Sequence, residues 1–148
     1  MFKNVLIPTD GSPIASKAVN AGVQLAKQSG AAVIGYCAFE TTPVGTDFEG
    51  YDIGGTDADR APAMSARDIG ENSVAEIAKA AADAGLPFTA VVEEATTPHD
   101  GIIQAAIEHE CDLIVMASHG RSGLTGLVLG SVTNKVLSHS TIPVLVYR

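Results

Sequence analysis

Basic side chains are scarce in this chain of 148 residues, and their scarcity excludes one class of partner. Nine Lys and Arg residues stand against 17 Asp and Glu residues, so the net charge is −8. A protein that binds nucleic acid needs a basic surface to neutralise phosphates, and no basic stripe is present in the sequence. We therefore expect no nucleic-acid partner, and any bound polyanion must be held by local backbone amides or by a divalent ion.

Cysteines and long apolar runs are also few. Cys37 and Cys111 are far apart, lie beside apolar runs and form no CxxC or Cys/His cluster, which favours buried, reduced thiols. No apolar stretch approaches the ~20 residues that span a bilayer, and residues 1–4 do not resemble the start of a signal peptide. We expect a cytoplasmic protein without a membrane partner, folded as a single domain over residues 1–148.

Short apolar runs alternate with amphipathic segments along the chain. Strands are expected at about 5–8, 31–39, 86–92, 112–116 and 143–147, and helices at about 13–29 and 63–84, from 98 onward, and at 131–139. Apolar runs alternating with amphipathic helices predict a parallel, doubly wound α/β sheet. In such sheets ligands bind beyond the carboxyl ends of the strands, where the strand order reverses.

Capping residues mark the ends of these helices. Ser12 is the expected N-cap of the first helix and Gly30 its stop, and Gly85 closes the second helix. Thr97 is the expected N-cap of the third helix, with Asp100 in the capping-box position. The third helix is expected to pack inward through three apolar residues, which are Ile103, Ala106 and Ile107. The polar, glycine-rich segment 40–59 is expected to be a long loop, serving either as a lid or as a solvated connector.

A glycine-punctuated segment follows the fourth apolar run. It has the form A-x2-G-x9-G-S, built from Ala117, Gly120, Gly130 and Ser131. Glycines let backbone N–H groups turn inward, and a helix that starts at Gly130-Ser131 adds unpaired amides and the positive end of its dipole. The segment therefore predicts a phosphate site, with Ser131 either capping the helix or donating its hydroxyl to phosphate. The alternative is an unoccupied tight loop.

This segment resembles the nucleotide-binding signature of the universal stress protein family, G-x2-G-x9-G-[ST], with one departure at Ala117. The runs 5–12 and 142–146 also resemble that family's first and last strands. The resemblance implies an open, Rossmann-like, five-stranded parallel sheet of order 3-2-1-4-5 with helices on both faces. It also implies ATP or AMP between strands one and four, and a homodimer formed through the last strand.

The resemblance and the glycine pattern together give a set of expected nucleotide contacts. They are Pro8, Thr9, Asp10, Ala38, Ala117, Ser118, His119, Gly120, Arg121, Gly130, Ser131, Val132 and Thr133. By resemblance, Pro8-Thr9-Asp10 matches the family's adenosine-contacting residues, and the backbone of Ala38 corresponds to its contact with the adenine edge. Asp10 is expected to bind a ribose hydroxyl or Mg²⁺, or else to form an Asx turn with Gly11-Ser12.

Other residues of the segment carry open alternatives. The methyl group of Ala117 weakens binding or leaves it unaffected if the residue is still strand-like. Arg121, with Ser122, contacts the terminal phosphate or forms a solvated loop tip, and Thr133 either assists or lies on the helix surface. His119 is the one candidate general base, but no orienting carboxylate is evident, which favours a bystander.

Three functions remain in view. The first is a stress-response regulator or sensor that binds ATP or AMP, hydrolyses ATP slowly at most, and acts on a protein partner that the sequence does not identify. The second is an enzyme such as an adenylyltransferase or ATP pyrophosphatase, but HxGH, SGGxDS, GxGxxG and Walker A patterns are absent at the required places. The third is a dimeric interaction module that binds no nucleotide, which only Ala117 favours.

Overall fold

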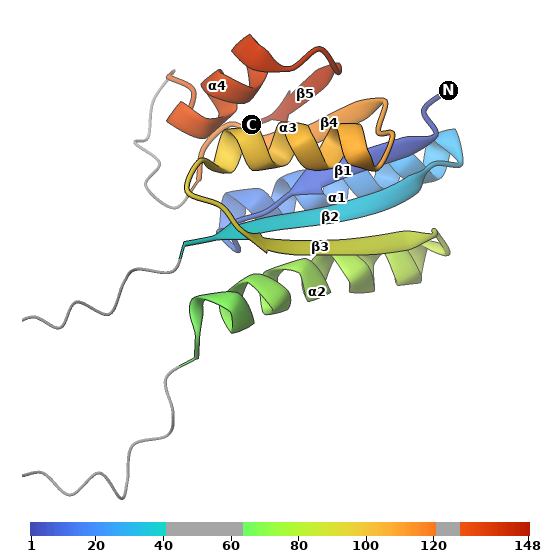
Figure 1. Ribbon diagram of the computed structural model, residues 1–148. Helices are drawn as coiled ribbons and strands as arrows, with labels where there is room; N and C mark the ends of the chain where they lie inside the picture. Colours follow the sequence, from blue (N-terminus) through green and yellow to red (C-terminus); the bar gives the residue numbers. More distant parts are fainter. Residues whose placement is uncertain (41–63, 121–127) are drawn as a thin grey trace, which may run out of the picture.

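Parallel strands and helices alternate along the chain in the computed structural model, which describes residues 1–40, 64–120 and 128–148. The elements are β1 (Asn4–Pro8), α1 (Pro13–Ser29), β2 (Ala32–Phe39), α2 (Ala66–Ala84), β3 (Phe88–Glu94), α3 (Pro98–Glu108), β4 (Leu113–Ala117), α4 (Ser131–His139) and β5 (Val144–Tyr147). The strands form one sheet in the order β3-β2-β1-β4-β5, and all neighbours are parallel (Figure 1). The predicted fold class and strand order are confirmed.

Helices cover both faces of the sheet, with α1 and α2 on one side and α3 and α4 on the other (Figure 1). Successive side chains of a strand point to opposite faces, so a strand buried on both faces reads as a continuous apolar run. In β1, Val5 and Ile7 join the core beneath α1 and α2, and Leu6 joins the core beneath α3 and α4. The strand order reverses at β1, which opens a crevice between the carboxyl ends of β1 and β4.

Local caps set the ends of the first two helices as predicted. The Ser12 hydroxyl accepts a hydrogen bond from the amide of Ala15, and Gly30 ends α1 in a left-handed conformation with φ of 70°. Gly85 ends α2 in the same way, with φ of 73°. The start of α2 differs from the prediction, because Ser65 caps the helix through a capping box with Asp68.

The predicted bounds of the third strand are wrong. Its expected span was 86–92, whereas β3 runs from Phe88 to Glu94. The amide of Leu86 donates to the carbonyl of Ala81 at 2.9 Å, so this residue completes the end of α2 instead of starting a strand. At the other end, Glu93 and Glu94 pair with β2 despite their charge, because β3 is an edge strand whose side chains reach water.

Two predictions about the third helix are confirmed only in part. Thr97 is the N-cap residue of α3, as predicted, but its side chain makes no capping hydrogen bond. Ala106 is buried and Ile103 packs against the core, as predicted, but Ile107 is 53% exposed, and Ile102 and Ala105 complete the inward face. The sequence offers apolar residues on two overlapping faces of this helix, and packing against β2 and α4 selects one of them.

The remaining predictions about the chain can be placed briefly. Cys37 and Cys111 are buried free thiols, as expected. Most of the predicted loop at 40–59 lies outside the described residues, so its role as lid or connector stays open. No helix in the described part of the chain is long and apolar enough to cross a bilayer.

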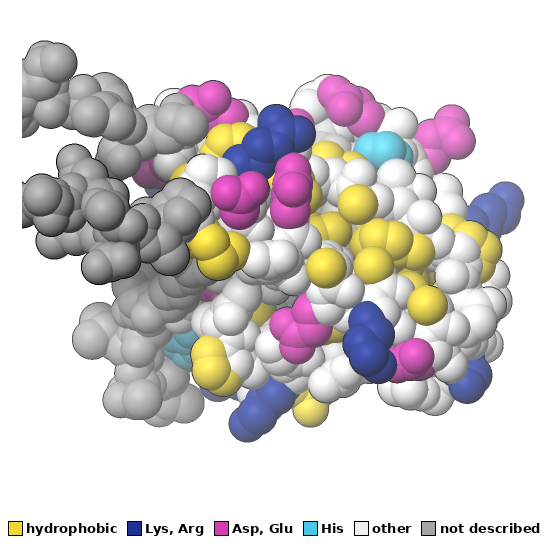
Figure 2. Space-filling view, turned by 90° about the horizontal axis from the view of Figure 1, so that it is seen from below, with side chains coloured by type: hydrophobic (Ala, Val, Ile, Leu, Met, Phe, Trp, Pro, Cys, Tyr) yellow, Lys and Arg dark blue, Asp and Glu magenta, His cyan; other side chains and the backbone are white. Residues whose placement is uncertain are grey.

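Charged side chains of opposite sign lie close together on the face formed by α1 and α2 (Figure 2). On α2, Arg67 pairs with Glu71 at 2.9 Å and Lys79 pairs with Asp83 at 2.6 Å. Both are exposed pairs spaced four residues apart, which contribute little to stability. They leave the charge of this face mixed rather than basic.

Candidate functional site

The carboxyl end of β1 turns sharply into α1 through two side-chain hydrogen bonds. The Thr9 hydroxyl accepts from the amide of Gly11 at 3.1 Å, and the Asp10 carboxylate accepts from the amide of Ser12 at 3.0 Å. The Asx turn foreseen for Asp10 is therefore present. It orients this carboxylate toward the crevice between β1 and β4, where it lines a cavity.

The carboxyl end of β4 is tied directly to the first turn of α4. The Gly130 amide donates to the carbonyl of Ser118 at 2.8 Å, and the buried Thr133 hydroxyl donates to the carbonyl of Ala117 at 2.9 Å. Thr133 is 3% exposed, so its prediction as helix surface is wrong. Ala117 lies within β4, which agrees with the alternative that its backbone is still strand-like.

The N-terminus of α4 has no side-chain cap. Gly130 is the N-cap and Ser131 is the first helical residue, so the prediction that Ser131 caps the helix is wrong. By contrast, hydroxyl groups cap α1 and α2. The first amides of a helix lack intrahelical partners and carry the positive end of its dipole. At α4 these groups border the cavity and suit an anionic oxygen.

Two of the glycines are required by close approaches of the backbone. A β-carbon added to Gly120 would lie 2.7 Å from Oδ2 of Asp10, so the loop after β4 touches the end of β1. A β-carbon on Gly130 would lie 3.3 Å from Cα of His119 and from the carbonyl oxygen of Ser118. Both glycines therefore allow segments distant in sequence to converge on one place.

His119 has a partner at each ring nitrogen. Its Nδ1 lies 2.9 Å from the hydroxyl of Ser118, and its Nε2 is hydrogen-bonded to the carbonyl of Val128. Donation from Nε2–H to the carbonyl and acceptance at Nδ1 from the hydroxyl satisfy both contacts with a neutral ring. A ligand that used this imidazole as a base would have to displace one of these partners.

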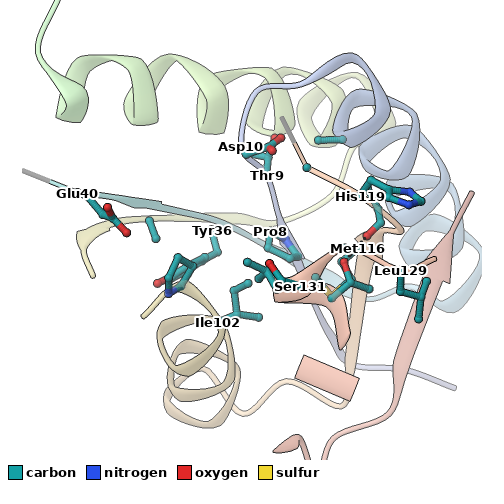
Figure 3. A pocket seen from close by; sticks show the side chains of 18 of the residues that line it. Pro8, Thr9, Asp10, Tyr36, Glu40, Ile102, Met116, His119, Leu129 and Ser131 are labelled. Atoms are coloured by element: carbon teal, nitrogen blue, oxygen red, sulfur yellow. Dashed lines mark hydrogen bonds between the residues drawn. The ribbon is translucent and has the colours of Figure 1, made fainter. Parts of the chain in front are cut away.

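These elements enclose a cavity of about 780 Å³, a size typical of small-molecule sites (Figure 3). Of the predicted contacts, those that line it are Pro8, Thr9, Asp10, Ala38, Ala117, His119, Gly120, Gly130, Ser131, Val132 and Thr133. Ser118 is 2% exposed and is not among the lining residues. Arg121 lies outside the described residues.

Sequence reasoning missed a second set of lining residues. They are Ala15, Tyr36, Glu40, Pro98, Ile102, Met116, Val128 and Leu129. Tyr36 and Met116 lie in the carboxyl-terminal halves of β2 and β4, and Pro98 and Ile102 lie in the first turns of α3. A signal was available, since every strand end and helix start on this edge of a parallel sheet faces the same crevice.

The cavity has no concentrated charge in the described part of the chain. Its charged lining residues are Asp10 and Glu40, and none of the described lining residues is Lys or Arg. No group of three His, Cys, Asp or Glu side chains among the described residues is placed to hold a metal ion. Magnesium is commonly held by one carboxylate together with ligand phosphates, so Asp10 alone is compatible with such a role, which stays a prediction.

Comparisons with known proteins agree with this geometry. The family model described as the universal stress protein family matches residues 1–148. The chain is 32% identical over 152 residues to the universal stress protein YxiE of Bacillus subtilis, covering all of both chains. It is 28% identical over 150 residues to the universal stress protein MJ0531 of Methanocaldococcus jannaschii, covering 100% of this chain and 83% of the relative.

Solved structures show the same fold. The structure of protein MJ0577, a universal stress protein of Methanocaldococcus jannaschii, aligns with a TM-score of 0.71 at 25% identity, covering 99% of this chain and 95% of that one. A universal stress protein family protein of Arabidopsis thaliana with AMP bound aligns with a TM-score of 0.68 at 14% identity, covering 97% and 90%. With the family model matched from end to end, this chain belongs to the universal stress protein family.

Proposed function

We propose that the crevice between β1 and β4 binds an adenine nucleotide, ATP or AMP, and that the protein acts as a nucleotide-dependent regulator or sensor in a stress response. The observation that carries the proposal is the uncapped first turn of α4, whose residues line a cavity of about 780 Å³. Helix amides without a side-chain cap that border a cavity provide hydrogen-bond donors and positive potential for a phosphate without a basic side chain. This suits a chain with a net charge of −8.

Adenine is favoured as the base by the ligands of structural relatives. One universal stress protein has been solved in complex with cAMP, one from Archaeoglobus fulgidus with dAMP, and the Arabidopsis thaliana protein with AMP. Their identities to this chain are 24%, 17% and 14%, so the likeness itself extends to the fold. The transfer of an adenine ligand to this chain is therefore part of the proposal.

The lining residues suggest how the ligand is oriented. Phosphates lie at the end formed by Gly120, Gly130 and the first turn of α4, where amides are available. The ribose lies beside Asp10, which can accept a hydrogen bond from a hydroxyl or bind Mg²⁺ together with the phosphates. The base reaches toward Ala38 on β2, where apolar side chains line the cavity.

We propose slow ATP hydrolysis at most. Both nitrogens of His119, the candidate base, already have hydrogen-bond partners. General-base catalysis needs a free acceptor within hydrogen-bond reach of the attacking water. Signalling would then rest on occupancy: bound nucleotide changes the surface around the site, and a protein partner recognises the occupied form.

The proposal also includes a homodimer formed through β5, and the cytoplasmic location stays a prediction. Leu145 and Tyr147 on this edge strand are 39% and 38% exposed. Apolar side chains on an unpaired strand edge favour association with a second copy. Sedimentation of the wild type and of Leu145→Lys would test this, since the charged variant should be monomeric at concentrations where the wild type is a dimer.

The decisive experiment on binding has two parts. Mass spectrometry would identify small molecules released from freshly purified protein, and calorimetry would follow titration of the stripped protein with ATP and AMP, with and without Mg²⁺. We expect co-purified adenine nucleotide or micromolar affinity. Absence of bound nucleotide and of heat at millimolar ligand would leave the nucleotide-free dimeric interaction module as the better account.

A glycine variant tests the observation that carries the proposal. In Gly130→Ala the new β-carbon meets backbone atoms of the loop after β4, so the first turn of α4 must shift. Losing one charge-assisted contact to phosphate corresponds to roughly a tenfold or greater fall in affinity. The matched control is Gly70→Ala, whose β-carbon would meet the Val92 side chain at 3.1 Å, away from the cavity. Equal affinities in the two variants would contradict phosphate binding at α4.

A further inference from the structure

One wall of the cavity is formed by a tyrosine of β2 that contacts β3 and α3. Tyr36 comes from β2, is 1% exposed and forms part of the cavity floor. Figure 3 shows it beside Ile102 of α3, on the opposite side of the cavity from His119 and Leu129. The ring therefore borders the part of the cavity that Ile102 lines, away from His119 and Leu129.

The position of this ring is fixed by a hydrogen bond and by a missing side chain. The Tyr36 hydroxyl donates to Oε1 of Glu93 on β3 at 2.8 Å. On the helix side, a β-carbon added to Gly101 would lie 2.1 Å from the Tyr36 hydroxyl oxygen and 3.2 Å from Oε1 of Glu93. Glycine is less favourable than alanine in a helix interior, and here it leaves the space that the hydroxyl fills.

The hydroxyl remains a hydrogen-bond donor over the physiological pH range. Burial, followed by the hydrogen bond to Glu93 and its negative charge, raises the pKa of Tyr36 above its ordinary value. Neutral phenol is thus the form that packs against Gly101. Three segments distant in sequence cooperate to hold one aromatic ring at the end of the cavity.

We propose that Tyr36, held by Glu93 and Gly101, is a specificity-determining residue that sets the size of the base accepted at the β2 end of the cavity. The inference rests on the proposed function, because the amides of α4 place the phosphates at one end and leave this apolar end for the base. A wall fixed from two sides cannot move aside for a larger ligand, so a base with an added substituent is excluded by contact.

Removing the Tyr36 ring should have a different effect on the cavity from truncating a neighbouring core side chain. Because Tyr36 lies at the cavity surface, Tyr36→Ala extends the cavity into the core. Ile34 belongs to the same buried cluster but is not a lining residue, so Ile34→Ala leaves a sealed void. Both variants lose stability, but only the first creates new space that a ligand can enter.

The test compares affinities for AMP and for AMP analogues enlarged at C2, N6 or C8 of the purine. The wild type and Ile34→Ala should prefer AMP to every enlarged analogue by the same ratios. In Tyr36→Ala at least one enlarged analogue should gain about tenfold relative to AMP, the scale on which pockets discriminate added methylene groups. Tyr36→Phe keeps the ring but loses the hydrogen bond to Glu93, so its ratios should lie between those of the wild type and those of Tyr36→Ala.

A rescue experiment tests the role of Gly101. Gly101→Ala should push the Tyr36 hydroxyl from its place and weaken AMP binding at least fivefold. Adding Tyr36→Phe should restore most of the affinity, because the atom nearest to the new β-carbon is then removed. If Tyr36→Ala does not fold, as judged by circular dichroism, this single and double variant decide the question.

The outcomes separate this inference from the function on which it rests. A wild type that binds no adenine nucleotide refutes both. A wild type that binds AMP, with analogue ratios unchanged in Tyr36→Ala, or with no rescue in the double variant, refutes the role of Tyr36 and leaves the proposed function intact. A changed ratio in Tyr36→Ala or rescue of Gly101→Ala supports it.

Discussion

Replacing Thr133 by valine is a sharp test of how α4 is held against β4. The Thr133 hydroxyl donates to the carbonyl of Ala117 at 2.9 Å, and the threonine is 3% exposed. Valine has the same branched shape and nearly the same volume, so Thr133→Val changes a buried hydroxyl into a methyl group and little else. The variant therefore isolates the hydrogen bond that joins the first turn of α4 to the end of β4.

The expected loss follows from the energetics of a buried hydrogen bond. The intact bond contributes about 0.5–1.5 kcal/mol net, and a buried carbonyl left without this partner costs about 1–3 kcal/mol. The added methyl group recovers up to about 0.8 kcal/mol through burial. We expect the free energy of unfolding to fall by about 1–2 kcal/mol, which lowers Tm by about 2–8 °C for a chain of this length.

Urea denaturation followed by circular dichroism would measure this change, with an unaltered m-value showing that the unfolded state is the same. Thr133→Ser, which keeps the hydroxyl, should retain most of the hydrogen-bond contribution. Thr89→Val on the exposed part of β3 controls for the substitution itself. If Thr133→Val is as stable as the wild type, or if Thr133→Ser loses as much as Thr133→Val, the bond does not hold α4 as argued.

The other predictions concern the core, a buried thiol and the unusual residue of the glycine segment. Ile77→Ala in α2 should lower the free energy of unfolding by about 2–5 kcal/mol in urea titrations, because the side chain is 0% exposed. Ile107→Ala on the exposed face of α3 should change it by under about 0.5 kcal/mol. A loss in Ile107→Ala as large as that in Ile77→Ala would contradict the assigned face of α3. Burial, with a smaller effect of Asp112, raises the pKa of Cys111 to about 11, so the native state holds this proton more tightly than the unfolded state. The free energy of unfolding should therefore decline as pH rises from about 9 toward about 11. Thermal unfolding measured against pH should show a smaller decline in Cys111→Ala. Ala117→Gly should change the affinity for AMP, measured by calorimetry, by less than about threefold, because the residue lies in β4 with ordinary strand backbone. A gain of about tenfold would instead show that the methyl group obstructs the site.

Much of the fold was predictable because its signals are local. A strand buried on both faces must be apolar throughout, and this identified β1, β2 and β4 to within a residue or two. Capping by Ser12 and termination at Gly30 depend on hydrogen bonds and backbone angles within a few residues. Predictions failed where a neighbouring element decides the outcome, as for the inward face of α3 and the bounds of β3.

The sequence predicted those site residues that lie in the glycine segment 117–133 and at the end of β1. Glycines at positions 120 and 130 indicate close backbone approach whatever the partner, and the order of a parallel sheet brings Asp10 to the same edge. Thr133 was misplaced because only the position of α4 against β4 buries its hydroxyl.

The sequence by itself determined the alternation of strands and helices, the parallel sheet and the edge at which a ligand would bind, because periodicity, caps and glycine spacing act over short distances. Tertiary structure alone decided which side chains close the cavity. Tyr36 and Glu93 are 57 positions apart, and no local pattern links either of them to Gly101. Their contact exists because β2, β3 and α3 are packed side by side, and packing is a property of the assembled fold rather than of any one segment.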